Sequence, residues 1–337
     1  IVDNQIYLNY DGIYATESSS PTISVNTIEN NSNRGVYAEV GSAPSVTNND
    51  ILNNVVGVST YQANPTIQGN TIKDTFETTL DMTGVLVSYS SPTITSNDIL
   101  NINGKGIECD NGNPQITYNT IKNNSYAGIG LWYCSPVISH NTVKDTRIEE
   151  GYTWSGNGIF VSNQSSPNIH NNTIKDNLGD GIFLFDWDNA SHPSIRDNTF
   201  KDNGKWGIHA RYTKPATSES DLKNDNTFFD QGDGWILQEW YLVVHVTDDG
   251  NDIEGAWVNV TEYPYTGGYV WSGQTGTGGL TPKITLKEYY YDNNGNKQTP
   301  TPHRVHAEAK IGVVLKECLK YPTVNHNYDE YQMELEP

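Results

Sequence analysis

Hydrophobic positions in the first two-thirds of the chain recur in short alternating runs. Residues 114–131, PQITYNTIKNNSYAGIGL, show the unit: alternating runs at 116–121 and 129–131 are separated by corners rich in Asn and Gly. Runs this short do not fold alone, so neighbouring copies must cover them. The pattern predicts one turn of a parallel β-solenoid.

Copies of this unit continue to residue 239. A Pro-x-Ile/Val-x-x-Asn pattern places Asn at one corner in eight clear copies, at Asn26, Asn49, Asn70, Asn97, Asn119, Asn141, Asn172 and Asn198, with a partial copy at Asn4 and a degenerate one at Asn226. A Gly followed by an apolar residue falls once in each interval. We therefore expect ten coils, in which the Asn amides stack and satisfy backbone groups at a corner where Asn and Gly tolerate positive φ. These asparagines are predicted to be structural.

From Trp240 the repeat stops. Residues 240–337 contain about seven short strands or hairpins bounded by Gly, Asn or Pro, which is typical of a β-sandwich. The chain is predicted to be all-β, with a parallel β-helix of about ten coils at 1–239 and a small sandwich at 240–337.

Charge and composition narrow the partners. Forty acidic against 20 basic residues give a net charge of -20, which argues against nucleic acid and anionic membranes and suits cations, neutral glycans and solubility. No run of eighteen apolar residues occurs, so no membrane insertion is expected. Sequons are compatible with secretion and lie at Asn30, Asn123, Asn163, Asn171, Asn189 and Asn259. At Asn171 the adjoining ladder position leaves little room for a glycan.

The cysteines and histidines predict no metal or cofactor site. Cys109 lies three residues after its Gly and Cys134 six, so the two are not stacked; Cys109 is expected to be a buried small hydrophobe, and a disulfide between them is disfavoured. An intermolecular bridge from Cys134 or Cys318 is open. His303 and His306 have opposite strand parity and make a poor metal pair. Calcium is left open without a motif.

Outward positions two and four after each Gly form the candidate functional surface. In coils five to nine these positions, with an adjoining loop, bring together Trp132, Phe160, Phe183, Phe185, Glu108, Asp110, His209, Arg211, Asp186, Trp187 and Asp188. An exposed aromatic patch indicates contact with a partner. Two interpretations are open: the second domain or another subunit packs here, or the patch is a carbohydrate-binding groove. Insertions at 73–83 and 144–157, three coils apart, are candidates for flanking that groove.

The NTIKNN and GI-x-L/V elements, as at 119–124 and 128–131, resemble the right-handed parallel β-helix repeat family that includes NosD proteins and the carbohydrate-binding and sugar-hydrolase (CASH) domains. This resemblance covers 1–239 and implies the fold without fixing the chemistry. Residues 240–337, with DDGNDIEGAWVNV and TPHRVHAEA, look like the carboxypeptidase-regulatory-like, immunoglobulin-like modules of archaeal, methanogen-type surface proteins. Together the resemblances imply a secreted cell-surface protein.

Catalysis has weak support in this pattern. Asp110 and Arg211 are four coils apart, on the order of 19 Å, which is too far for joint action. Asp186 or Asp188 could meet His209 or Arg211 one coil away, so these four are the catalytic candidates, but no ladder shows the three acids with Lys or Arg of pectate lyases.

The sequence therefore favours a structural role over an enzymatic one. Ile1 begins part-way into a coil, so we expect a trimmed chain whose first coil is uncapped and can accept a strand from another copy. Our first hypothesis is head-to-tail self-assembly into an extracellular layer, sheath or filament. The alternative is a polysaccharide-binding or polysaccharide-cleaving protein, a glycoside hydrolase or a lyase.

Overall fold

The computed structural model describes residues 1–74, 82–311 and 313–336. These residues form two compact units. The first comprises Ile1–Asp186, Ala190–His209 and Lys214–Ile236, and the second comprises Trp187–Asn189, Ala210–Thr213 and Leu237–Pro337. Most of the insertion at 73–83, expected to flank a groove, lies outside the described residues.

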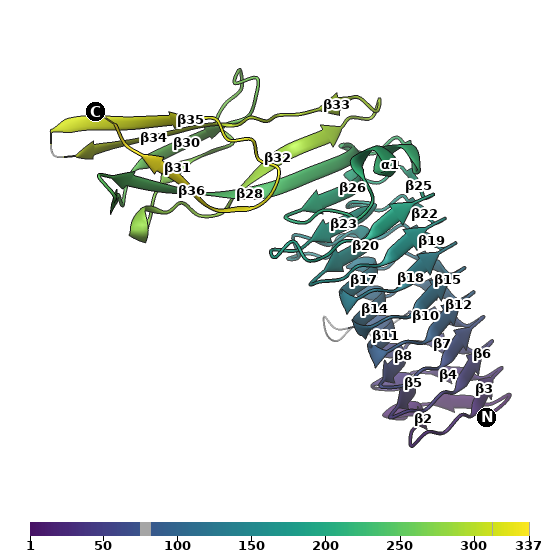
Figure 1. Ribbon diagram of the computed structural model, residues 1–337. Helices are drawn as coiled ribbons and strands as arrows, with labels where there is room; N and C mark the ends of the chain where they lie inside the picture. The colour runs from purple at the N-terminus through teal and green to yellow at the C-terminus, as the bar shows by residue number, and fades with distance from the viewer. Residues whose placement is uncertain (75–81, 312, 337) are drawn as a thin grey trace. The chain divides into compact units, whose positions relative to one another are not determined.

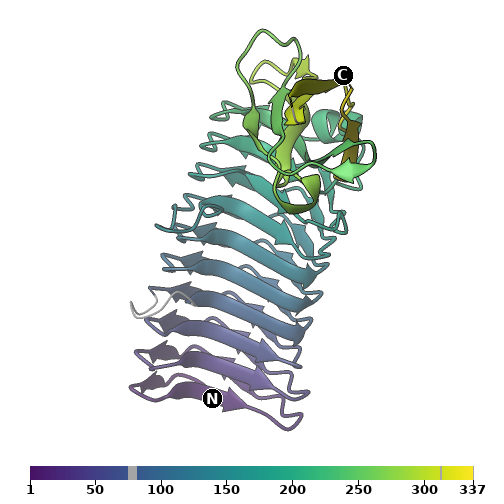
Figure 2. The ribbon, with the colours of Figure 1, turned by 90° about the vertical axis from the view of Figure 1, so that its left-hand side faces the viewer.

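The first unit is a parallel β-helix whose coils stack one on another, which confirms the fold predicted from the repeat (Figures 1 and 2). The first of its three sheets contains β1 (Gln5–Tyr7), β4 (Thr27–Glu29), β7 (Asp50–Leu52), β10 (Thr71–Lys73), β13 (Asp98–Leu100), β16 (Thr120–Lys122), β19 (Thr142–Lys144), β22 (Thr173–Lys175), β25 (Thr199–Lys201) and β27 (Thr227–Phe229). The second contains β3 (Thr22–Ser24), β6 (Ser45–Thr47), β9 (Thr66–Gln68), β12 (Thr93–Thr95), β15 (Gln115–Thr117), β18 (Val137–Ser139), β21 (Asn168–His170) and β24 (Ser194–Arg196).

The third sheet has the longer strands and carries the candidate surface. It contains β2 (Asp11–Ala15), β5 (Arg34–Glu39), β8 (Val56–Tyr61), β11 (Thr83–Ser90), β14 (Lys105–Gly112), β17 (Ala127–Cys134), β20 (Asn157–Ser162), β23 (Ile182–Phe185), β26 (Trp206–Arg211) and β28 (Gly234–Asp248). A short helix, α1 (Glu219–Asn224), precedes β27.

Apolar side chains stack in columns inside the β-helix. Ile99, Ile121 and Val143 are consecutive register partners in the first sheet, and all three are fully buried. Because strand side chains alternate, one inward residue per short strand suffices to build a continuous column. Burying such a side chain contributes about 1.5–3 kcal/mol, so the columns stabilise the stack.

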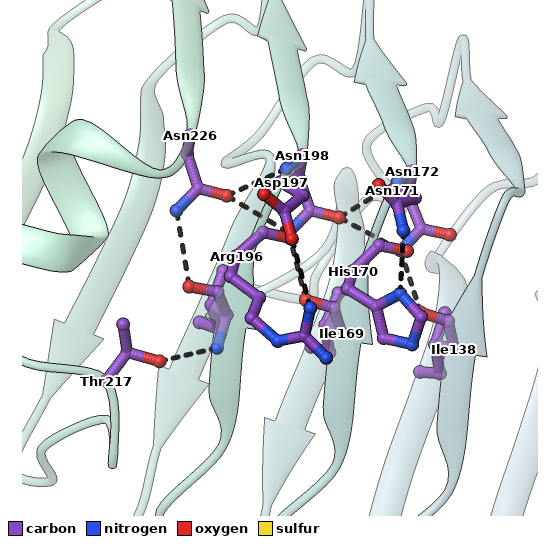
Figure 3. A network of polar contacts seen from close by, with 11 residues as sticks. Ile138, Ile169, His170, Asn171, Asn172, Arg196, Asp197, Asn198, Thr217 and Asn226 are labelled. Carbon is purple, nitrogen blue, oxygen red and sulfur yellow. Dashed lines mark hydrogen bonds and ion pairs between the residues drawn. The ribbon is translucent and has the colours of Figure 1, made fainter.

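A ladder of buried asparagines runs along one corner. The side-chain amide of Asn119 donates to Oδ1 of Asn141 at 3.0 Å, and the same oxygen accepts the Asn119 backbone N–H at 2.9 Å. Figure 3 shows the end of this ladder at Asn172, Asn198 and Asn226. Each amide thereby satisfies a backbone donor in the neighbouring coil, which a buried corner requires.

A second amide ladder, which the repeat analysis missed, runs along the next corner. Asn9 donates to Asn31 at 3.2 Å and Asn31 to Asn54 at 2.9 Å. Toward the other end Asn177 donates to Asn203, also at 2.9 Å. The last Asn of the NTIKNN unit, Asn124 in the copy at 119–124, is the sequence signal for this ladder.

At the corner of the first Asn ladder, the residue with positive φ is the one before the ladder Asn, and not the ladder Asn itself as the sequence suggested. Tyr118 and His140, with φ of 58° and 59°, directly precede ladder asparagines. The Asn141 amide also donates to the carbonyl of Ser139 at 3.1 Å, across the residue with positive φ. The ladder residue therefore clamps a left-handed conformation that costs a non-glycine residue about 1–2 kcal/mol.

Cys109 and Cys134 form a disulfide, so the expectation that they stay apart was wrong. Cys134 is the register partner of Gly112, not of Cys109, but both sulfur-bearing residues are fully buried and their Cα atoms are 6.3 Å apart. The chain turns at Tyr133, where φ is 54°, and this turn directs the next side chain inward. Cys318 is free and buried.

The second unit packs two groups of strands around one core. β28 pairs with β29 (Asn251–Asp252) and, in parallel, with β36 (Tyr328–Glu334), and its sheet continues through β32 (Ile284–Tyr291) to β33 (Lys297–Gln298). The opposing antiparallel sheet has the order β31 (Trp271–Gln274), β30 (Trp257–Thr261), β34 (Arg304–Ile311), β35 (Val314–Lys320), and a 3-10 turn, η1 (Thr277–Gly279), lies between strands. Leu242, Val258, Val305 and Met333 belong to the shared core. Among the described residues no helix is long and apolar enough to cross a membrane.

Candidate functional site

A depression of about 320 Å³ lies on the outer face of the third sheet in the first unit. Its lining residues come from β14 and β17 and from the corner after β20: Lys105, Glu108, Asp110, Trp132, Tyr133 and Asn163. Asp110 and Trp132 are register partners on neighbouring strands, so the parallel pairing places a carboxylate beside an indole ring. Three residues predicted for the candidate surface, Glu108, Asp110 and Trp132, thus line one cavity.

Gly130 determines where the Trp132 ring lies. Gly130 stands between Glu108 and Phe160 in the outward column, and it leaves a notch because it has no side chain. The Trp132 ring fills that notch: a Cβ atom on Gly130 would be 2.6 Å from ring atom Cζ3, closer than real contacts allow. The ring of Phe160 supports the indole, with ring centroids 5.5 Å apart.

Lys105 contacts both a carboxylate and the indole ring of the depression. Its ammonium lies 2.9 Å from Glu108 Oε1 and 5.0 Å from the centre of the Trp132 ring, so it forms an ion pair and a cation–π contact together. The hydroxyl of Thr83 donates to Glu108 Oε2 at 3.1 Å. The Asn111 amide donates to Asp110 at 2.8 Å. The two carboxylates are therefore fixed in position beside the aromatic ring.

The three phenylalanines of the candidate surface are buried, contrary to the expectation of an exposed patch. Phe160, Phe183 and Phe185 are only 3%, 2% and 6% exposed. The insertion at 144–157 places Trp154 against Phe185, with ring centroids 4.5 Å apart. Phe185 therefore packs beneath the insertion, whereas Phe160 and Phe183 pack against each other, with ring centroids 5.8 Å apart.

The exposed aromatic residues near the depression include three that sequence reasoning missed. Tyr133 lies near the end of β17, and Tyr152 and Trp154 lie on the insertion; all three are exposed. Tyr152 also packs edge-on against Tyr126, at 5.5 Å. The aromatic residues of the GYTWSGN segment were the available signal. They were missed because the alternation of side chains along a strand does not predict where the side chains of a loop point. The acids Glu149 and Glu150 of the same insertion do not line the depression.

Two of the catalytic candidates in the first unit have structural contacts. Asp186 is buried, and it accepts hydrogen bonds from the Gln164 backbone N–H at 2.8 Å and the Ser191 hydroxyl at 2.6 Å. His209 is also buried, and its Nδ1 lies 3.2 Å from Asp180 Oδ2. Neither side chain lines the Trp132 depression.

The remaining candidates belong to the second unit. Arg211 donates to Glu239 at 2.6 Å. The Trp187 ring stacks on Tyr212 at 4.4 Å, and the Lys283 ammonium lies 4.4 Å from the Trp187 ring centre, so the aromatic face is already in use. Asp188 is exposed. None of these three lines the depression that holds Glu108, Asp110 and Trp132.

The sequons differ in accessibility. Asn171 is exposed, although the repeat suggested little room there, because the stacked residue is its neighbour Asn172. The other five are half-buried: Asn30, Asn123, Asn163, Asn189 and Asn259. Asn163 lines the depression, so a glycan attached there would obstruct it.

Comparisons with solved structures give distant likenesses. The enzymatically active domain of bacteriophage CBA120 tailspike protein 2 is 9% identical, with a TM-score of 0.44, over 95% of this chain and 70% of that chain. An alginate lyase from Paenibacillus sp. str. FPU-7 is 11% identical, with a TM-score of 0.35, over 69% and 89% of the two chains. Pectate lyase Pel9A is 13% identical, with a TM-score of 0.38, over 64% and 69%. Likenesses of this size do not bear on function.

A search of curated proteins finds no match to the chain. The family model for the right-handed β-helix region matches residues 1–82 and 83–238, which is more than half of the chain and spans the whole series of coils described above. The chain therefore belongs to the right-handed β-helix family.

Proposed function

We propose that this protein binds a neutral polysaccharide at the Trp132 depression. The observation that carries the proposal is the composition of the lining, which places an indole ring beside two carboxylates, an ammonium group and an amide in about 320 Å³. A sugar ring presents an apolar C–H face and a rim of hydroxyls. The indole suits the first, and Glu108, Asp110 and Asn163 suit the second.

Charge favours a neutral ligand over an anionic one. The net charge of -20 repels polyanions. The one lysine that lines the depression, Lys105, is already paired with Glu108. A neutral polysaccharide is not repelled by the net charge and does not need Lys105 as a counter-ion.

The test is binding of the full chain to a panel of neutral and anionic polysaccharides, measured by affinity electrophoresis and calorimetry. Loss of a central aromatic contact typically costs about 2 kcal/mol, so Trp132→Ala is expected to weaken binding about 30-fold. Gly130→Ala keeps the indole but displaces it from its notch, and should weaken binding as well. Trp257→Ala, at an exposed tryptophan of the second unit, is the matched control and should bind normally. Equal binding by Trp132→Ala and Trp257→Ala would refute the proposal.

Cleavage of the bound glycan is the second candidate function. Glu108 and Asp110 are two residues apart on β14 and both line the depression, which places their Cα atoms about 6.6 Å apart. Glycosidases use two carboxyl groups about 5–9.5 Å apart, and the Glu108 and Asp110 side chains leave the same face of β14. Release of new reducing ends by the wild type, lost in Asp110→Asn with binding retained, would add hydrolysis to the proposed binding.

Glycan binding takes precedence over the self-assembly expected from the sequence. The depression has a lining that suits a sugar ring, and it carries the glycan proposal, whereas self-assembly stays a prediction. The sequence resemblance to CASH domains agrees with the proposal, and the cell-surface location stays a prediction. The archaeal, immunoglobulin-like character of the second unit stays a prediction.

A further inference from the structure

A cluster of potential metal ligands lies on one face of the antiparallel sheet of the second unit. His306 and Glu308 are two residues apart on β34, so their side chains leave the same face. Glu317 on β35 is the register partner of Glu308. One ligand atom from each of the three side chains lies within 4.8 Å of the others. His306 Nε2 is 3.1 Å from Glu317 Oε2.

The register brings the two carboxylates of the cluster together as a like-charge pair. Like charges directly opposite each other on paired strands are destabilising, and Glu308 and Glu317 are such a pair. The His306 contact offsets the charge of Glu317 only when the imidazole is protonated. A divalent cation would neutralise both carboxylates and use the imidazole nitrogen as a third ligand.

We propose that His306, Glu308 and Glu317 bind a divalent transition-metal ion, with Zn²⁺ as the representative ion. The imidazole selects this class, because Ca²⁺ and Mg²⁺ prefer sites made of oxygen ligands, whereas Zn²⁺ accepts nitrogen and carboxylate ligands together. The sequence predicted no metal site here, because only His303 was considered as a partner for His306 and the two have opposite strand parity. The partners of His306 are the acids on its own face.

Three protein ligands leave a tetrahedral ion one open position. His306 and Glu317 also line a depression of about 470 Å³. Arg304 and Lys320 line the same depression, so solvent and two cationic side chains adjoin two of the three ligands. Water or a small anion would be the fourth ligand.

The experiment is calorimetric titration of the full chain with Zn²⁺, together with Co²⁺ titration followed by visible absorption. We expect one saturable site in the wild type and its loss in His306→Gln and in Glu317→Gln. His326→Gln is the matched control, because His326 is an exposed histidine of the same unit whose Nδ1 contacts Asn325, and it should retain the site. Excess Ca²⁺ should not displace the bound ion.

A stability readout separates ligation from misfolding. Ligand binding to the folded state raises the melting temperature, so Zn²⁺ should raise it for the wild type and for His326→Gln but not for Glu308→Gln. Without metal, Glu308→Gln should melt no lower than the wild type, because it removes a like-charge pair. The proposal is overturned if the wild type shows no saturable Zn²⁺ binding, or if His306→Gln binds as the wild type does.

Discussion

Replacing Asn119 by Ala tests the amide ladder at its middle. The Asn119 side chain is buried; it accepts from the backbone N–H of Asn97 at 2.9 Å and donates to the carbonyl of Ile94 at 2.9 Å. Removing it deprives two buried backbone groups of these partners. A buried polar group left unsatisfied costs about 1–3 kcal/mol, so two of them predict a loss of about 4 kcal/mol in the free energy of unfolding.

Urea unfolding followed by far-ultraviolet circular dichroism measures this loss in the full chain. Asn33→Ala is the matched control, because Asn33 is half-buried, does not have a positive φ, and its amide donates to the side chain of Asp11 at 3.0 Å. Its loss should stay below about 1 kcal/mol. If Asn119→Ala were no more destabilising than Asn33→Ala, the ladder would not stabilise the fold and the assignment of structural roles to the asparagines would fail.

Two further predictions concern the disulfide and a buried histidine. The double variant Cys109→Val, Cys134→Ser keeps side chains of suitable size but opens a link across 25 residues, which predicts a loss of about 3.5 kcal/mol; unfolding of this variant and the wild type at equal urea concentrations would contradict it. His303 is fully buried, neither ring nitrogen has a hydrogen-bond partner among the described residues, and burial lowers its pKa from 6.5 to about 4. Because the folded state has the lower pKa, stability should fall as pH drops from 6.5 to 4, by up to about 3.4 kcal/mol. His303→Leu should flatten that part of the pH profile, and an unchanged profile would refute the prediction.

The β-helix could be predicted because each coil repeats the same short pattern of apolar, Asn and Gly positions. Ile121 must face inward for the same reason as Ile99 and Val143, and a slip of one residue would expose the whole column. The Asn ladder follows from the same register. An Asn at a fixed corner lies next to the same corner of the coils above and below it, so its amide forms hydrogen bonds with groups in those coils. Agreement among ten approximate copies makes the inference strong even though each copy is short.

The disulfide was missed because parity counting assumes that the strand continues. Cys134 lies beyond the point where Tyr133 turns the chain, so its offset from the preceding Gly does not give its direction. Ser90 and Gly112 precede it at this corner, and the Ser165 hydroxyl accepts its backbone N–H at 3.0 Å. A column of small residues at a turn is therefore the signal that would have placed Cys134 inside.

The sequence predicted part of the candidate site. It failed for the phenylalanines because the direction in which a side chain leaves a strand does not determine its exposure to solvent. Alternation correctly sends both Trp132 and Phe183 out of the third sheet, but whether an outward ring meets solvent depends on what lies over it. Trp154 of a loop insertion covers Phe185, and Phe183 packs against Phe160 and His209. An absent side chain at Gly130, by contrast, gives the Trp132 ring a place on the sheet. The pairing of a small residue with a large one two positions along the same strand is readable in a sequence. In a β-helix, where every neighbour in the column is known from the register, that pairing indicates which aromatic residue can remain available to a ligand.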